Sequence, residues 1–209
     1  MARKYELKRR AERQEQTRQR IVEATVALHG SVGAANTTIS AIAERAGVER
    51  LTVYRHFPDE RALFGACSAH WNAGHPAPDP EPWQAIPDPA DRLHHGLTEL
   101  YAWFRQGEPM IANSLRDAPA IPALMEATAP VFVLIEQMAA ILAGGWDVPP
   151  DRRRLFRAAI GHALDFHAWR SLARTQDLTD DQAVALMTAM VHAAASGHEF
   201  ATSTRYTHA

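Results

Sequence analysis

The chain has 209 residues, of which 46% are hydrophobic, so it is long and apolar enough for one or two globular domains with a sizeable core. Its single cysteine, Cys67, excludes an internal disulfide framework. It opens on basic residues instead of a secretory leader, and its most apolar segment, 130–145, contains Glu136 and Gln137, so we expect a soluble cytoplasmic protein.

The net charge of −2 is distributed unevenly. Residues 1–58 hold 11 Lys and Arg against 6 Asp and Glu, whereas the other residues hold 11 against 18. A basic amino-terminal part is typical of a segment that meets polyanionic phosphate, although a difference of this size also arises by chance.

Apolar residues recur at spacings of three and four, and β-branched runs are absent, which predicts an all-α fold. A charged arm precedes an amphipathic first helix at 18–28, which Gly30 and Gly33 end. The further predicted helices are 38–46, 49–57, 59–72, 89–106, 109–116, 121–144, 151–174 and 179–198. Six prolines between residues 76 and 89 predict a linker or rigid loop, because proline donates no helical hydrogen bond.

Residues 38–57, TISAIAERAGVERLTVYRHF, have the pattern of a helix-turn-helix. Gly47 can adopt the left-handed conformation that reverses the chain, and Ala43 lets the second helix cross the first closely. The side chains expected in the shared core are Ile42, Ala46, Val48, Val53 and Phe57. The side chains expected to face outward and donate hydrogen bonds are Thr38, Arg50, Thr52, Tyr54, Arg55 and His56.

A helix in the major groove needs donors for phosphate oxygens and for base edges. Arg50 is the best candidate for base contact, because its guanidinium can span the two acceptors of guanine. Thr52 suits a thymine methyl or a phosphate, and Tyr54, His56 and the Thr38 hydroxyl suit phosphate. Spacing alone leaves a second interpretation open, in which two packed helices expose a solvated basic face.

Four segments carry a resemblance: TRQRIV at 17–22, IAERAGV at 42–48, TVYRHFP at 52–58 and LF at 63–64. In these segments the chain resembles the amino-terminal domain of the TetR family of bacterial regulators. The resemblance implies a homodimer on a palindromic operator and a variable helical body that binds a ligand and dimerises. The positions it implies for DNA contact are Thr38, Arg50, Leu51, Thr52, Tyr54 and His56.

Two positions depart from the family pattern. Glu60 stands where the family often carries a lysine that reaches phosphate, so either Arg61 replaces this contact or the contact is missing. Leu51 replaces a residue that is commonly small, which favours a thymine methyl contact over close backbone approach.

The resemblance and the composition together predict the domain organisation. We expect a basic flexible arm at 1–16, a DNA-binding domain with a connecting fourth helix at 17–72, a proline-rich loop at 73–88, a helical effector-binding and dimerisation domain at 89–200, and a tail at 201–209. The basic residues of the arm are Arg3, Lys4, Lys8, Arg9, Arg10 and Arg13. They add sequence-independent affinity or enter a minor groove, or else the arm is a solvated tail.

Aromatic and methionine side chains of the body either line a cavity for a small apolar effector or form plain core. The candidate pocket residues are Trp103, Phe104, Met110, Phe132, Phe166 and Trp169. Small residues at 158–161 and 189–197 permit close helix approach, across a dimer seam or within one subunit. Although the chain has 11 histidines, their spacing matches no zinc or di-iron site, so we expect neither metal nor cofactor.

Together with the resemblance to the TetR family, the sequence predicts a ligand-responsive repressor that binds DNA as a homodimer and is not an enzyme. The alternatives are a DNA-binding regulator without an effector and a helical-bundle enzyme. Against the enzyme, the sequence has no nucleophile-elbow pattern, no phosphate-cradling glycine loop and no paired carboxylates on one helix face.

Overall fold

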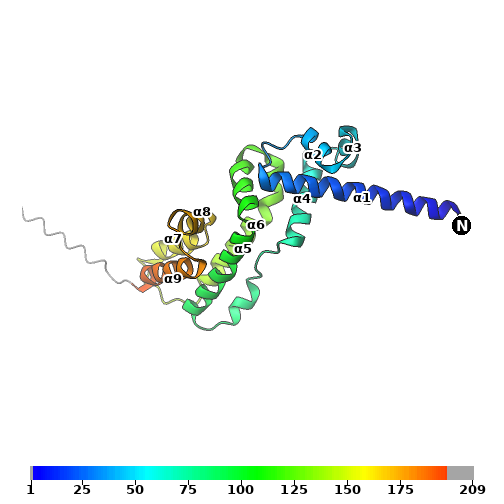
Figure 1. Cartoon of the computed structure of the whole chain (residues 1–209). Helices are drawn as coiled ribbons and strands as arrows, with labels where there is room; N and C mark the ends of the chain where they lie inside the picture. Colours follow the sequence, from blue (N-terminus) through cyan, green and yellow to red (C-terminus); the bar gives the residue numbers. More distant parts are fainter. Residues whose placement is uncertain (1, 197–209) are drawn as a thin grey trace, which may run out of the picture. The chain divides into compact units, whose positions relative to one another are not determined.

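The computed structural model describes residues 2–196, and every regular element within this range is helical (Figure 1). The predicted all-α class is confirmed. The predicted tail at 201–209 and the end of the predicted body, 197–200, lie outside the described residues, as do the side chains of Arg3 and Lys4. The chain divides into two compact units, one of residues 2–77 and 104–133 and one of residues 78–103 and 134–196.

The first helix, α1 (Ala2–Ser31), is longer than the sequence predicted, because it includes the stretch expected to be an arm. Glu, Lys, Arg and Gln dominate residues 6–20, and all four are strong helix formers. Ion pairs one turn apart add support, with Lys8 Nζ 3.9 Å from Glu12 Oε1 and Arg18 Nη1 4.0 Å from Glu15 Oε1. Residues 5–16 are all exposed, so only the later turns of α1 pack on the protein.

The helix-turn-helix consists of α2 (Ile39–Ala46) and α3 (Arg50–His56), followed by α4 (Glu60–Gly74). Thr38 caps α2, since its hydroxyl accepts a hydrogen bond from the amide of Ala41 at 3.1 Å. Gly47 ends α2 with φ of +63°, which confirms the predicted left-handed turn. Asp59 caps α4 as predicted, with its carboxylate 2.8 Å from the amide nitrogen of Ala62.

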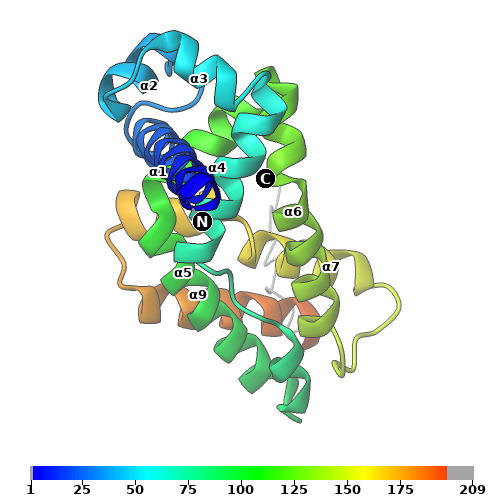
Figure 2. The ribbon, with the colours of Figure 1, turned by 90° about the vertical axis from the view of Figure 1, so that its right-hand side faces the viewer.

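One apolar core joins α1, α2, α3 and α4, and Figure 2 looks along α1 with α2 and α3 beside it. The buried members of this core are Ile21, Val22, Ala24, Ile42, Ala43, Ala46, Val53, Phe57, Leu63 and Cys67. Four of the five predicted core residues are among them, and the fifth, Val48, is partly buried against them. The motif therefore packs as the sequence predicted.

The end of α5 (Pro89–Asp117), the short 3-10 turn η2 (Ala118–Ala120) and the start of α6 (Pro122–Leu142) complete the first unit. The predicted break between 106 and 109 is wrong, because α5 continues through Pro109. Proline removes one helical hydrogen bond, and the long amphipathic helix persists despite this local cost.

By length and composition, α6 is the one helix in the described range that could cross a membrane, with a mean hydropathy of 1.4 over its most apolar window. Only 11% of that window is buried. Glu126 and Glu136 interrupt its apolar sequence.

The second unit contains the 3-10 helix η1 (Glu81–Ala85), the start of α5, the end of α6, α7 (Arg153–Ala163), α8 (Phe166–Arg170), the π-helical turn η3 (Ser171–Thr175) and α9 (Asp180–Ser196). The prediction of one continuous helix at 151–174 is wrong, because α7 ends at Ala163 and a separate helix, α8, begins at Phe166. Asp165 starts the new helix by accepting a hydrogen bond from Ala168 at 2.8 Å.

The proline-rich segment is a packed loop and not an open linker. Trp83 is buried, and its indole nitrogen donates to Glu99 Oε2 at 2.9 Å. Arg92 donates to the carbonyl of Ile86 at 3.0 Å and also to the carbonyl of Gly144, so it joins this loop to the end of α6. The rigid-loop alternative of the sequence analysis therefore describes the segment better.

Candidate nucleic-acid interface

The outer face of α3 is exposed, whereas its inner face is buried. Val53 is 0% exposed, whereas Leu51 and Tyr54, on the other side of this short helix, are 68% and 47% exposed. Arg50 and Arg55 are also exposed, one at each end of the helix. Because residues four apart share a face, the two pairs 50/54 and 51/55 form one continuous outer surface.

The remaining predicted contacts lie at the margins of this surface. Thr38 is exposed at the start of α2, and because its hydroxyl oxygen accepts the capping bond, its proton is left to donate. Thr52 and His56 are half-buried, and Thr52 Oγ1 accepts a hydrogen bond from Arg55 Nη2 at 3.3 Å. The structure thus places all six predicted residues on α3 or at the start of α2.

The start of α4 offers no unpaired cation for phosphate. Glu60 is the first residue of α4, and Arg61 Nη2 lies 2.7 Å from Glu126 Oε1 on α6. The Arg61 charge is therefore balanced within the first unit. Of the two alternatives left by the sequence, this pairing favours a missing phosphate contact.

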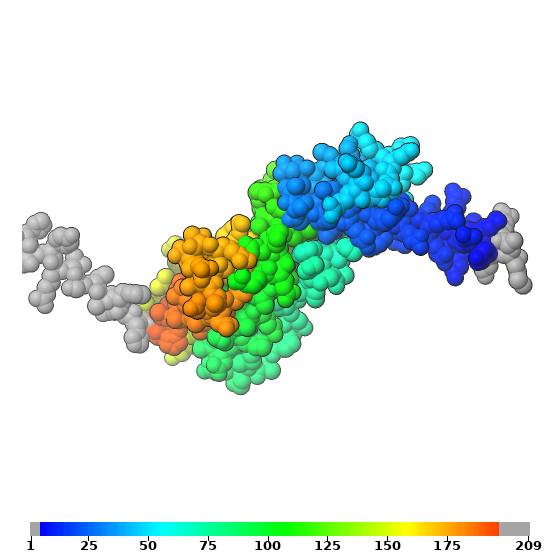
Figure 3. All heavy atoms as spheres, in the orientation of Figure 1, coloured from blue at the N-terminus to red at the C-terminus, as the bar shows by residue number. Residues whose placement is uncertain are grey.

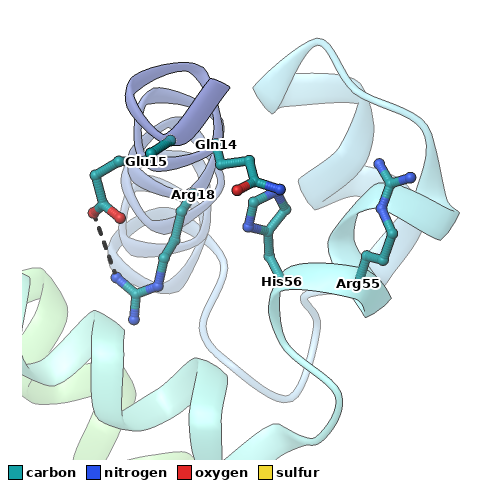
Figure 4. A pocket seen from close by; sticks show the side chains of 6 residues that line it. Gln14, Glu15, Arg18, Arg55 and His56 are labelled. Atoms are coloured by element: carbon teal, nitrogen blue, oxygen red, sulfur yellow. Dashed lines mark ion pairs between the residues drawn. The ribbon is translucent and has the colours of Figure 1, made fainter. Parts of the chain in front are cut away.

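A cleft of about 340 Å³ separates α1 from the end of α3 (Figure 4). Its lining residues are Ala11, Gln14, Glu15 and Arg18 of α1 and Arg55 and His56 of α3. Figure 4 shows Gln14 pointing toward His56, and Arg18 paired with Glu15. The Arg18 guanidinium also lies over the Phe57 ring, 5.1 Å from its centroid. This contact holds the Arg18 side chain against the core shared by α1, α2, α3 and α4, which together we call the head.

The sequence analysis did not identify Gln14 and Arg18 as neighbours of the helix-turn-helix. Positions 11, 14, 15 and 18 do share one helical face, so their spacing was a usable signal. The approach of α3 to that face depends on tertiary packing, and the stretch before Thr17 was expected to be an arm and not a helix.

Polar side chains at the end of α5 hold the connection between α1 and α2. Asn113 Nδ2 donates to the carbonyls of His29 and Gly30, at 2.9 and 3.0 Å. Asp117 Oδ2 accepts from the amide of Ala35 at 3.0 Å, and its Oδ1 lies 2.7 Å from Arg116 Nε. The hydrogen-bonded Arg116 guanidinium holds the pKa of the Asp117 carboxyl below its usual range.

This connection has little room. Gly33 has φ of +89°, a conformation that other residues rarely adopt. A Cβ at Gly33 would also collide with the Arg116 guanidinium and the Asp117 carboxylate. The loop that leads into α2 is therefore fixed both by its backbone conformation and by α5.

The candidate pocket residues of the body do not form one group. Trp103, Phe166 and Trp169 belong to the second unit and are buried, and the Phe166 and Trp169 rings lie 5.6 Å apart. The other three candidates, Phe104, Met110 and Phe132, belong to the first unit. Phe104 is buried, Met110 is half-buried and Phe132 is exposed.

Comparison with known proteins bears on the head most directly. Residues 21–67 match the family described as bacterial regulatory proteins, tetR family, a span that includes α2, α3 and most of the core around them. The chain therefore carries the amino-terminal domain of a TetR-family transcriptional regulator. No curated protein matches the chain.

Solved structures show that the family fold extends beyond the head. A TetR-like regulator from Rhodococcus sp. RHA1 is 18% identical, with a TM-score of 0.61 over 85% of this chain and 94% of that one. A tetR-family regulator from Streptomyces coelicolor is 20% identical, with a TM-score of 0.54 over 86% of this chain and 79% of the other. The multidrug-binding protein EbrR, solved with imidazole, is 25% identical, with a TM-score of 0.52 over 83% and 88%.

Proposed function

We propose that this TetR-family regulator is a cytoplasmic, ligand-responsive repressor that acts as a homodimer on a palindromic operator. The observation that carries the proposal is the exposed outer face of α3, held by a buried Val53 and a left-handed turn at Gly47. A recognition helix requires this combination of a fixed inner face and a donor-bearing outer face.

The roles within the interface follow from chemistry and position. Arg50, in the first turn of α3, reads a guanine edge, and the exposed Leu51 contacts a thymine methyl. Tyr54, His56 and the Thr38 hydroxyl donate to phosphates on either side, and Thr52 contacts a phosphate or a thymine methyl.

Exposed apolar side chains on α7 and α9 support homodimerisation. The two helices pack on each other within the second unit. Leu155 on α7 is 55% exposed and Leu186 on α9 is 50% exposed. A Cβ at Gly161 would meet nothing within 4 Å, so packing within the subunit does not explain the glycine. A partner helix that approaches this surface closely would explain both features.

Ligand response is proposed on two grounds: the aromatic content of the body and the likeness to EbrR, which is described as multidrug-binding. The buried Trp103, Phe166 and Trp169 are the candidates in the second unit. A ligand that binds the folded body raises its melting temperature with concentration, so a ligand screen in thermal melts tests this part.

Fluorescence anisotropy tests the proposed DNA binding. The labelled duplexes come from the region upstream of the gene that encodes this protein, and a scrambled duplex is the comparison. We expect preference for an upstream duplex, a steep loss of affinity with salt, and loss of most of the preference in Arg50→Ala. Arg45→Ala, which removes an exposed arginine near the end of α2, is the matched control and should keep the preference. Equal binding of all duplexes by the unmodified protein would overturn the proposal.

A further inference from the structure

The amino-terminal half of α1 has no role in the packing of the protein. Every side chain from residue 5 to residue 16 is exposed, and Figure 3 shows the outer turns of α1 extending beyond α2 and α3. Apart from Tyr5, Leu7 and Ala11, these side chains are polar or charged, and none of them is buried. Strong helix formers and ion pairs one turn apart keep this half helical, so its side chains are available to a partner.

The cleft between α1 and α3 shows where such a partner would bind. On its α1 wall stand Gln14 and Arg18, and on its α3 wall stand Arg55 and His56. All four side chains carry N–H donors suited to an anionic oxygen, and two of them are guanidinium groups. Lys8 lies one turn further out, on the same side of α1 as Ala11, because residues three apart are neighbours on a helix.

We propose that this cleft seats a backbone phosphate of duplex DNA and that the exposed half of α1 then lies along the duplex as a second DNA-binding element. The proposal rests on the function proposed above and extends it to residues outside the helix-turn-helix. The occupant we propose is a phosphodiester, because four of the six lining side chains carry N–H donors and two of these four are guanidinium groups, which pair with phosphate oxygens.

Glu15 is the one side chain of the cleft that opposes this occupant. Its carboxylate lies 4.0 Å from Arg18 Nη1, so in free protein it balances the Arg18 charge. When a phosphate enters, the Arg18 guanidinium exchanges its pairing with the Glu15 carboxylate for pairing with the phosphate. The Glu15 carboxylate then lies beside a second anion. Repulsion between Glu15 and the phosphate therefore lowers the affinity for DNA, and removal of the Glu15 charge should raise this affinity.

Because a phosphate contact is independent of sequence, the test uses a labelled 30-base-pair duplex of random sequence and full-length protein. Gln14→Glu adds a negative charge at the cleft, and Gln16→Glu adds the same charge on the far side of the same helix. Both positions are exposed, so both variants should fold, which circular dichroism and a thermal melt verify. We expect about a fivefold or greater loss of affinity for Gln14→Glu, under about twofold for Gln16→Glu, and a salt slope that falls by about one phosphate contact only in the former.

A second matched pair tests the opposite direction. Glu15→Gln should tighten binding about two- to fivefold, whereas Glu136→Gln, which removes the same charge from an exposed position on α6, should change it by less than about twofold. If each cleft variant and its control changed the affinity equally, the cleft proposal would be overturned, whereas the proposed DNA-binding function would stand. If the unmodified protein binds no duplex at all, the proposed function itself fails.

Discussion

Asn113 donates its side-chain amide to the backbone carbonyl of His29, 84 residues earlier in the chain, at 2.9 Å. One turn later on the same helix, Asp117 accepts from the amide of Ala35. Together these bonds tie the end of α5 to both sides of the α1–α2 connection. The orientation of the helix-turn-helix relative to α5 is therefore set by polar contacts that single substitutions can remove.

Asp117→Asn should destabilise the protein by about 1–3 kcal/mol, because the buried group loses its charge-assisted bonds to Arg116. Urea unfolding at pH 7 measures the loss. Because the folded pKa of Asp117 is lowered, its contribution is full above the ordinary carboxyl pKa of 3.8 and disappears as the pH falls through the lower folded value. Asp147→Asn, at an exposed site, should stay within about 0.5 kcal/mol, and an equal loss there would contradict the assignment.

His29 should make stability depend on pH in a separate and milder range. Burial lowers its pKa from 6.5 to about 4, and its ring stacks on Phe64 with centroids 5.2 Å apart. The unfolded chain therefore binds the extra proton between these two pH values, so stability is full above pH 6.5 and falls as the pH drops toward 4. The difference amounts to about 3 kcal/mol at most.

His29→Phe keeps an aromatic ring against Phe64 and removes the titrating group. Urea unfolding at pH 7 and at pH 4.5 should show a smaller difference for this variant than for the unmodified protein. The same difference in both proteins would exclude His29 as its source.

Leu186→Glu should convert the proposed dimer into a monomer, because it places a charge on an exposed apolar surface of α9. Light scattering coupled to size-exclusion chromatography measures the mass directly. Val133→Glu replaces an exposed apolar side chain of α6 by the same charge. This variant is the control and should leave the mass unchanged. Dissociation by the α6 variant alone would move the dimer surface from α7 and α9 to α6.

Cys67 should be inert in the folded protein and reactive after unfolding. It is buried in the core of the head, and burial raises the pKa of its thiol to about 12. The reactive thiolate is therefore almost absent at pH 8. Labelling with a chromogenic disulfide reagent should be slow without denaturant and fast in urea, and rapid labelling of native protein would contradict the buried environment.

The local elements of the head could be predicted because each rests on a signal in its own sequence. Thr38, Gly47 and Asp59 mark helix ends through caps and a left-handed turn, and these depend on neighbours within four residues. Burial of Val53 and Phe57 followed from their spacing. The six predicted contact residues consequently fall on one side of the motif or at its edge.

Predictions that depended on distant contacts were less accurate. Pro109 is a strong local signal for a helix end, but tertiary packing keeps α5 continuous through it. Conversely, nothing local marked the break at Asp165 strongly enough to divide the predicted helix 151–174. The cleft beside α3 was missed for the same reason, since Gln14 and Arg18 come near His56 only once α1 packs on the head.

The buried part of α1 begins at Ile21, while the turns before Thr17 touch little else in the protein. Changes in the length or charge of that outer stretch therefore leave the fold intact. If it lies along DNA as proposed, the strength of binding and the choice of base sequence are encoded in separate stretches of the chain. Substitutions could then adjust occupancy of an operator gradually without changing which operator is recognised.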